Sequence, residues 1–180
     1  MKFAVVSSYL PPMPSGQSTA LYRLLRDLPQ ESYCLIASNQ EMPAIDDQHS
    51  SRVLRGKLFK LTPEFRLHRG YRAGLGKIRE RINIPLILRQ RGRQMADIVR
   101  REKCEAIVAC TGGPDLMDLP SAALAARLAQ VKFYPYYFDD YYYQWTLGGY
   151  FYWQATDGAR AGRRLEKQIM RRASRVIVAN

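Results

Sequence analysis

Three short polar segments, each directly after an apolar run, carry residue types that could bind or react with a small ligand. They are Ser15-Gly16-Gln17, Thr111-Gly112-Gly113 and the pair Asp139-Asp140. Short apolar runs bounded by such turns predict buried strands of a sheet. Open α/β sheets bind ligands at the carboxyl ends of their strands, so we expect the three segments to converge on one site.

The first segment has the chemistry of an anion site. Gly16 has no Cβ, so its backbone can approach a phosphate closely, and the helix predicted over 18–28 would point its positive end at that anion. A turn glycine without a ligand is the alternative interpretation. The G-x-G-x-x-G spacing of dinucleotide sites does not match this loop, which disfavours NAD.

The other two segments are suited to phosphates and sugars. The hydroxyl and two glycines at 111–113 could cradle such a ligand, or they could form a plain turn into the next helix. A carboxylate at 139 or 140 could accept hydrogen bonds from sugar hydroxyls, orient a substrate or act as a base. A solvated or helix-capping pair is the alternative. The predicted binding residues are Ser15, Gly16, Gln17, Thr111, Gly112 and Gly113, and the candidate catalytic residues are Asp139 and Asp140.

The elements that would position these segments alternate along the chain. Strands are predicted at 2–8, 33–38, 106–110, 132–138 and 175–180, with a short third strand at 52–54. Helices are predicted at 18–28, from Pro85 onwards, from about 118 or 120 to 129, and near 158–172. We read no clear periodicity at 56–84 and an aromatic loop after Asp140. This alternation predicts a single Rossmann-like α/β domain over 1–180, with a doubly wound, mostly parallel sheet and helices on both faces.

Composition narrows the class of protein. A chain of 180 residues with 47% hydrophobic residues suits one globular domain, and no apolar run is long enough to span a membrane. The three cysteines fit buried, reduced thiols of a cytoplasmic protein, and their spacing predicts no metal site. The two histidines, His49 and His68, are expected at the surface. No catalytic triad is recognisable.

Positive charge is concentrated in residues 52–101. This stretch holds fifteen basic and three acidic residues. Its net charge of +12 equals the formal net charge of the whole chain. Such a block predicts an anionic partner. We expect Arg66–Arg81 and the face of Arg89, Arg91 and Arg93 to lie on the inner leaflet of the plasma membrane; a solvated arginine-rich face is the alternative. Nucleic acid is disfavoured as partner because aromatics are not interleaved with the basic residues.

Aromatic residues are concentrated in one later segment. Twelve of the twenty Phe, Tyr and Trp residues lie between Tyr134 and Trp153. Side chains of this kind could stack on sugars, line an acceptor groove, lie at a lipid interface or cover a partner domain. Packing of a long loop onto the domain is the leading interpretation.

In order and spacing, the chain resembles the N-terminal half of GT-B glycosyltransferases of the retaining, glycogen-synthase-like group. The resemblance rests on the loop Pro11-Pro-Met-Pro-Ser-Gly-Gln17, the basic helix, the strand Ile107-Val-Ala-Cys-Thr-Gly-Gly113 and the strand end Tyr137-Phe138-Asp139-Asp140. Two positions depart from the family pattern. Gln17 stands where the family has a second glycine, and Phe138 where it frequently has a histidine.

The resemblance implies a function and a second, C-terminal domain. It implies transfer of a sugar from a nucleotide-sugar donor to an acceptor hydroxyl in bacterial polysaccharide or glycolipid synthesis, with a sugar or lipid-linked acceptor on this domain and no tightly bound cofactor. The nucleotide-sugar site would lie in a C-terminal domain that nothing in this sequence matches, so we expect this chain alone to be inactive. The unclosed last strand agrees with a first half of a longer enzyme. A basic nucleic-acid-binding module or another Rossmann-type nucleotide-using enzyme is the alternative.

Overall fold

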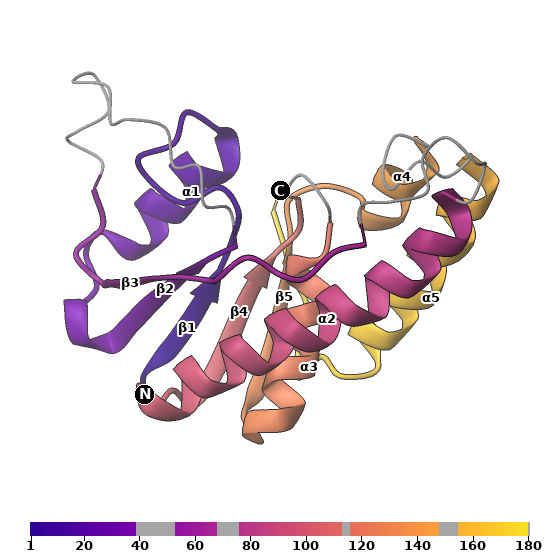
Figure 1. Ribbon diagram of the computed structural model, residues 1–180. Helices are drawn as coiled ribbons and strands as arrows, with labels where there is room; N and C mark the ends of the chain where they lie inside the picture. Colours follow the sequence, from indigo (N-terminus) through magenta and orange to yellow (C-terminus); the bar gives the residue numbers. More distant parts are fainter. Residues whose placement is uncertain (39–52, 68–75, 113–115, 148–154, 180) are drawn as a thin grey trace.

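The computed structural model describes residues 1–38, 53–67, 76–112, 116–147 and 155–179 as an α/β fold (Figure 1). In chain order the elements are β1 Phe3–Val6, α1 Gly16–Leu25, a 3-10 turn Gln30–Ser32, β2 Tyr33–Ala37, β3 Lys57–Lys60, α2 Gly76–Arg101, β4 Ala106–Cys110, α3 Asp118–Ala129, β5 Lys132–Tyr137, α4 Tyr141–Thr146, α5 Ala155–Met170 and β6 Ile177–Val178.

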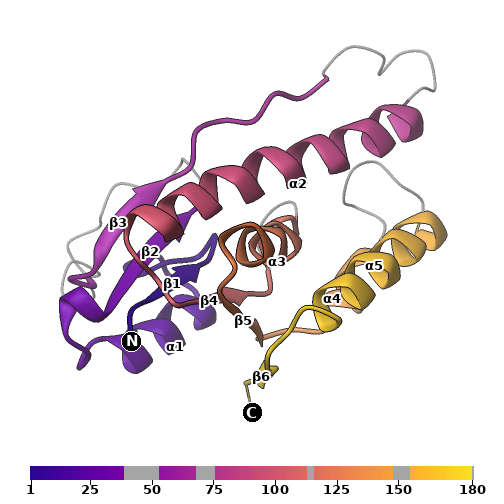
Figure 2. The ribbon, with the colours of Figure 1, turned by 90° about the horizontal axis from the view of Figure 1, so that it is seen from below.

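The described strands form one parallel sheet in the order β3-β2-β1-β4-β5-β6. In its centre Val5 pairs with Leu35 of β2 and with Val108 of β4. Helix α1 lies on one face of the sheet, and α2 and α3 lie on the other (Figures 1 and 2). The predicted Rossmann-like, doubly wound sheet with helices on both faces is therefore confirmed.

Two apolar clusters hold the layers together, one on each face of the sheet. Val6 and Ile36 belong to the cluster beneath α2 and α3, whereas their neighbours Val5 and Leu35 pack with Leu21 and other residues on the face of α1. Side chains of a strand alternate between faces, and both faces of this sheet are covered. The central strands consequently read as continuous apolar runs, which made them easy to predict.

The third strand lies at Lys57–Lys60; of the strand predicted at 52–54, residues 53 and 54 are not in a strand, and residue 52 lies outside the described residues. β3 is an edge strand whose side chains are mostly exposed, so it needs few apolar residues and gives a weak sequence signal. Its position is set by pairing with β2, in which Leu58 lies beside Leu35.

Helix α2 begins at Gly76 and passes through Pro85, where we expected it to begin. Three polar side chains of its first half, Arg79, Glu80 and Asn83, are buried, so the usual apolar stripe is interrupted. Arg79 donates to Glu80 at 2.6 Å, and Asn83 accepts from the backbone N–H of Leu67 at 2.9 Å. Because these buried positions are polar, the hydrophobic pattern of the sequence did not predict this part of the helix.

The aromatic segment after Asp140 begins with helix α4, so the predicted loop is wrong at 141–146. Tyr141 and Trp145 are fully buried and contact each other edge to face, with ring centroids 6.2 Å apart. Packing of these two side chains into the domain is confirmed. The cluster Tyr150–Trp153 lies outside the described residues.

Gly158 lets α5 approach α4 closely, and its replacement gives a first prediction. A Cβ at this position would lie 2.3 Å from the backbone carbonyl oxygen of Trp145. Alanine favours a helix interior by about 1 kcal/mol over glycine, yet the two helices would have to separate. We expect Gly158→Ala to lower the free energy of unfolding by about 2 kcal/mol in urea denaturation. The control is Gly16→Ala, whose Cβ meets no atom within 4 Å; equal stability of the two variants would contradict the prediction.

Candidate functional site

A cavity of about 460 Å³ lies at the carboxyl ends of β1, β4 and β5. Its lining comes from the segments that follow these strands and from α4: Tyr9, Ser15, Gly16, Gln17, Gly112, Phe138, Asp139 and Gln144. Each of the three predicted segments thus contributes to one cavity, as the parallel sheet requires. The roles of these residues in ligand binding stay predictions.

The N-terminus of α1 opens on this cavity. Ser15 is the N-cap, and its hydroxyl accepts a hydrogen bond from the backbone N–H of Ser18 at 3.0 Å. Gly16 is the first helical residue, and a Cβ there would project into open space. The positive end of the helix dipole therefore faces a cavity wall that has no side chain at Gly16, an arrangement suited to an anionic group.

Gln17 connects two of the strand ends. Its amide nitrogen donates to the hydroxyl of buried Ser7 at 2.8 Å. Its amide oxygen lies 3.0 Å from the place that a Cβ of Gly112 would occupy, and Gly112 has a φ of 96° that favours glycine. Gln17 and Gly112 therefore fit together at the cavity wall, so the departure from the family's second glycine has a structural use here.

Thr111 positions Asp139 and does not line the cavity. Its side chain is fully buried, and its hydroxyl accepts hydrogen bonds from the backbone N–H groups of Phe138 at 2.8 Å and Asp139 at 3.3 Å. These bonds fix the chain as it leaves β5. The Asp139 carboxylate accepts from the Gln144 amide at 3.3 Å. Gly113 lies outside the described residues.

Asp140 has a different environment from Asp139. It is the N-cap of α4, and its carboxylate accepts from the backbone N–H of Tyr143 at 2.9 Å. It also lines a second cavity of about 460 Å³ at the ends of β5 and β6, together with Tyr137, Phe138, Asp139, Tyr141, Glu166, Met170, Val176, Val178 and Ala179. Burial and, to a lesser extent, the Asp140 carboxylate raise the pKa of Glu166. The helix-capping alternative thus describes Asp140 but not Asp139.

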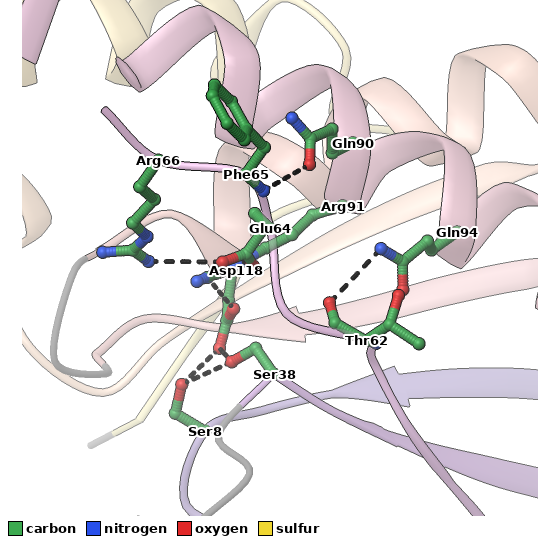
Figure 3. A network of polar contacts seen from close by, with 10 residues as sticks. All are labelled: Ser8, Ser38, Thr62, Glu64, Phe65, Arg66, Gln90, Arg91, Gln94 and Asp118. Carbon is green, nitrogen blue, oxygen red and sulfur yellow. Dashed lines mark hydrogen bonds and ion pairs between the residues drawn. The ribbon is translucent and has the colours of Figure 1, made fainter. Parts of the chain in front are cut away.

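A buried polar network beside the strand ends was missed from the sequence (Figure 3). Asp118, at the start of α3, accepts from Arg91 at 2.9 Å and from the hydroxyls of Ser8 and Ser38, which follow β1 and β2. Arg91 also donates to Glu64. The side chains of Asp118, Arg91 and Glu64 are 1%, 5% and 8% exposed. The network therefore ties two strands to two helices with charges that water hardly reaches.

Three amide side chains of α2 bind the backbone of the extended segment 62–67, among them Gln90 and Gln94, which Figure 3 shows. Gln94 accepts from the N–H of Thr62, and Gln90 from that of Phe65, each at 2.8 Å. Asn83 binds Leu67 in the same way. These residues recur on one side of the helix, a spacing that sequence analysis could have noticed among the arginines. They supply the backbone partners that a further strand would give.

The predicted arginine face of α2 is corrected by this network. Arg91 is buried between Glu64 and Asp118, whereas Arg89 and Arg93 are exposed. Arg79, within the predicted stretch Arg66–Arg81, is also buried, in its ion pair with Glu80. Arg69 and Arg72 lie outside the described residues. A side chain inside the protein cannot contact a membrane, so Arg79 and Arg91 do not belong to a membrane-facing surface.

The three cysteines lie inside the protein, and Cys34 and Cys104 contact each other with their sulfur atoms 3.7 Å apart. Cys34, Cys104 and Cys110 are buried and free, and burial raises the pKa of the Cys110 thiol, which keeps it protonated. Among residues the structure describes, no group of three or more His, Cys, Asp or Glu side chains could hold a metal ion. None of the helices in the described residues is both long and apolar enough to cross a membrane.

Comparison with known proteins relates the chain to solved structures but to no family model or curated sequence. Apo UGT2 of Phytolacca americana superposes over 100% of this chain with a TM-score of 0.50 and 9% identity. The chain spans 46% of that structure's length. At this identity the likeness concerns the fold alone, which this chain shares with a part of UGT2.

Proposed function

We propose that this chain is the acceptor-side domain of a glycosyltransferase that uses a nucleotide-sugar donor. The observation that carries the proposal is the cavity where Gly16, Gly112 and Asp139 meet at the strand ends of a glycosyltransferase-like fold. UGT2 is a UDP-glycosyltransferase, and the chain corresponds to less than half of it. The donor domain would accordingly be a separate C-terminal part of the enzyme.

The cavity suggests a role for each of its walls. The N-terminus of α1, open at Gly16, would face the donor phosphates and stabilise the charge that develops on them as the sugar departs. The Asp139 carboxylate, held by Thr111 through the backbone, would accept a hydrogen bond from a sugar hydroxyl and orient it for transfer. Asp140 already caps α4, so we assign this role to Asp139 alone.

Substitution of the two aspartates tests this function in the full-length protein. Transfer is measured with UDP-, GDP- and dTDP-sugars and a panel of acceptors. We expect Asp139→Asn to lower kcat/KM by about 100-fold, as expected for loss of a group that orients or deprotonates the acceptor. Asp140→Asn is the matched control, because asparagine caps helices as well as aspartate does.

The possible results test separately where the acceptor binds and whether the protein transfers sugars. Transfer that Asp139→Asn leaves at the wild-type rate would move the acceptor site away from this cavity. An equal loss of kcat/KM in Asp139→Asn and Asp140→Asn would indicate that the substitutions act through the structure of this segment and not through a contact of Asp139 with the acceptor. A full-length protein that transfers no sugar from any donor would contradict the proposed function itself.

A further inference from the structure

Two groups of basic residues in the described part of 52–101 differ in their surroundings. The first group is paired inside the protein or at its edge: Arg79 with Glu80, Arg91 with Glu64 and Asp118, and Lys57 with Glu102. The second group lies on the exposed side of the first half of α2. The second group is exposed and forms no ion pair with a described residue, and the residues beside it indicate which partner it would bind.

Exposed residues of the first half of α2 form one stripe, which we call the α2 stripe. At about 100° per residue, positions 78, 82, 85, 89 and 93 project within about 80° of one another, and position 81 lies beside them. Ile78 and Ile82 are 56% and 44% exposed, an unusual state for two isoleucines one turn apart. The stripe consists of Ile78, Arg81, Ile82, Pro85, Arg89 and Arg93, all exposed.

The charge of the α2 stripe is uncompensated. Glu80 is the one acidic residue between positions 76 and 93, and its side chain is 5% exposed in an ion pair with Arg79. Arg81, Arg89 and Arg93 form no ion pair with any described residue, so three positive charges remain. Phe65 is 64% exposed, and its backbone bond to Gln90 holds this aromatic residue beside α2 (Figure 3).

We propose that the α2 stripe binds the surface of an anionic lipid bilayer. An interfacial helix inserts apolar side chains at the level of the headgroups while arginines contact the lipid phosphates. The stripe has both components, whereas a soluble polyanion would need only the arginines. The two isoleucines and Phe65 are therefore the observation that favours a bilayer over nucleic acid.

Binding through the α2 stripe would also orient the domain. The N-terminal half of α2 lies toward the carboxyl ends of the strands, because the helix leads from the end of β3 back to the start of β4 (Figure 1). The cavity also lies at the carboxyl ends of the strands. Attachment would hold this side near the membrane. The inference does not depend on the chemistry that occurs in the cavity.

Co-sedimentation tests the proposal with this chain and with the full-length protein. Vesicles contain equal parts of phosphatidylglycerol and phosphatidylcholine, or phosphatidylcholine alone. We expect binding to the anionic vesicles only, and a loss of at least about 100-fold in partitioning for the variant Arg81→Glu, Arg89→Glu, Arg93→Glu. The matched control reverses three exposed charges elsewhere, Arg23→Glu, Lys132→Glu and Arg171→Glu, and should lose far less.

A second variant distinguishes lipid from other anions. Ile78→Ser with Ile82→Ser keeps every charge, and we expect it to weaken vesicle binding by about tenfold or more, since each isoleucine would lose its contact with the apolar interface. Circular dichroism and thermal unfolding check that each variant is folded. Equal partitioning to both vesicle types, equal loss in the two charge-reversed variants, or full vesicle binding by the serine variant would each overturn the proposal. So would tighter binding to duplex DNA than to the anionic vesicles.

Discussion

Replacement of Arg91 by methionine is expected to lower the free energy of unfolding by about 3–5 kcal/mol, because the buried Asp118 carboxylate would lose its ion pair with Arg91. Glu64 would retain its ion pair with Arg66 at 3.4 Å, whereas the Asp118 carboxylate would face the uncharged methionine side chain. Methionine fills a similar volume, so the loss would not arise from a cavity. Urea or thermal denaturation of the chain measures it.

Two further variants show that the charge is responsible. Arg93→Met changes an exposed arginine two residues away, and we expect its effect to stay within about 0.5 kcal/mol. Adding Glu64→Gln and Asp118→Asn to Arg91→Met removes the uncompensated charges, and an asparagine oxygen can still accept from Ser8 and Ser38. We expect this triple variant to recover more than half of the lost stability. Failure to recover would attribute the loss to packing instead.

The sequence predicted the centre of the fold well because that part obeys simple rules. β1, β2, β4 and β5 are apolar runs followed by turns, and parallel pairing brings their carboxyl ends together. This rule alone predicts that Gly16, Gly112 and Asp139 lie at one end of the sheet, and all three line the cavity there. It also predicted the two-sided sheet. What it could not give was the role of each side chain within the site.

Residue type alone could not distinguish a ligand-binding role from a structural one at Thr111 and Asp140. Threonine and aspartate are equally suited to bind a ligand or a backbone N–H, and only the path of the chain decides between them. Thr111 is turned inward to the N–H groups after β5, and Asp140 is directed to the start of α4. The first half of α2 was missed for a related reason: its buried face is polar, and a buried ion pair leaves no apolar pattern.

The prediction that bears most directly on function concerns Gly16. Its Cβ position is open, and the residue begins α1 behind a Ser15 cap, so a larger side chain should not disturb the fold. A tryptophan there would extend into the cavity of about 460 Å³ and occupy the space before the helix N-terminus. We therefore expect Gly16→Trp to lower kcat/KM for sugar transfer by at least about 1000-fold in the full-length protein, with the free energy of unfolding little changed.

The control for this variant is Gly16→Ala, which adds one methyl group at the same place and should keep activity within a few-fold of wild type. Binding of the nucleotide-sugar, measured by calorimetry, separates exclusion of the donor from a defect in transfer. If phosphates lie against the N-terminus of α1, the tryptophan variant loses donor affinity as well as turnover. A tryptophan variant that binds and transfers like wild type would show that the reacting groups meet elsewhere, and the convergence of three strand ends on this cavity would then be a property of the fold alone.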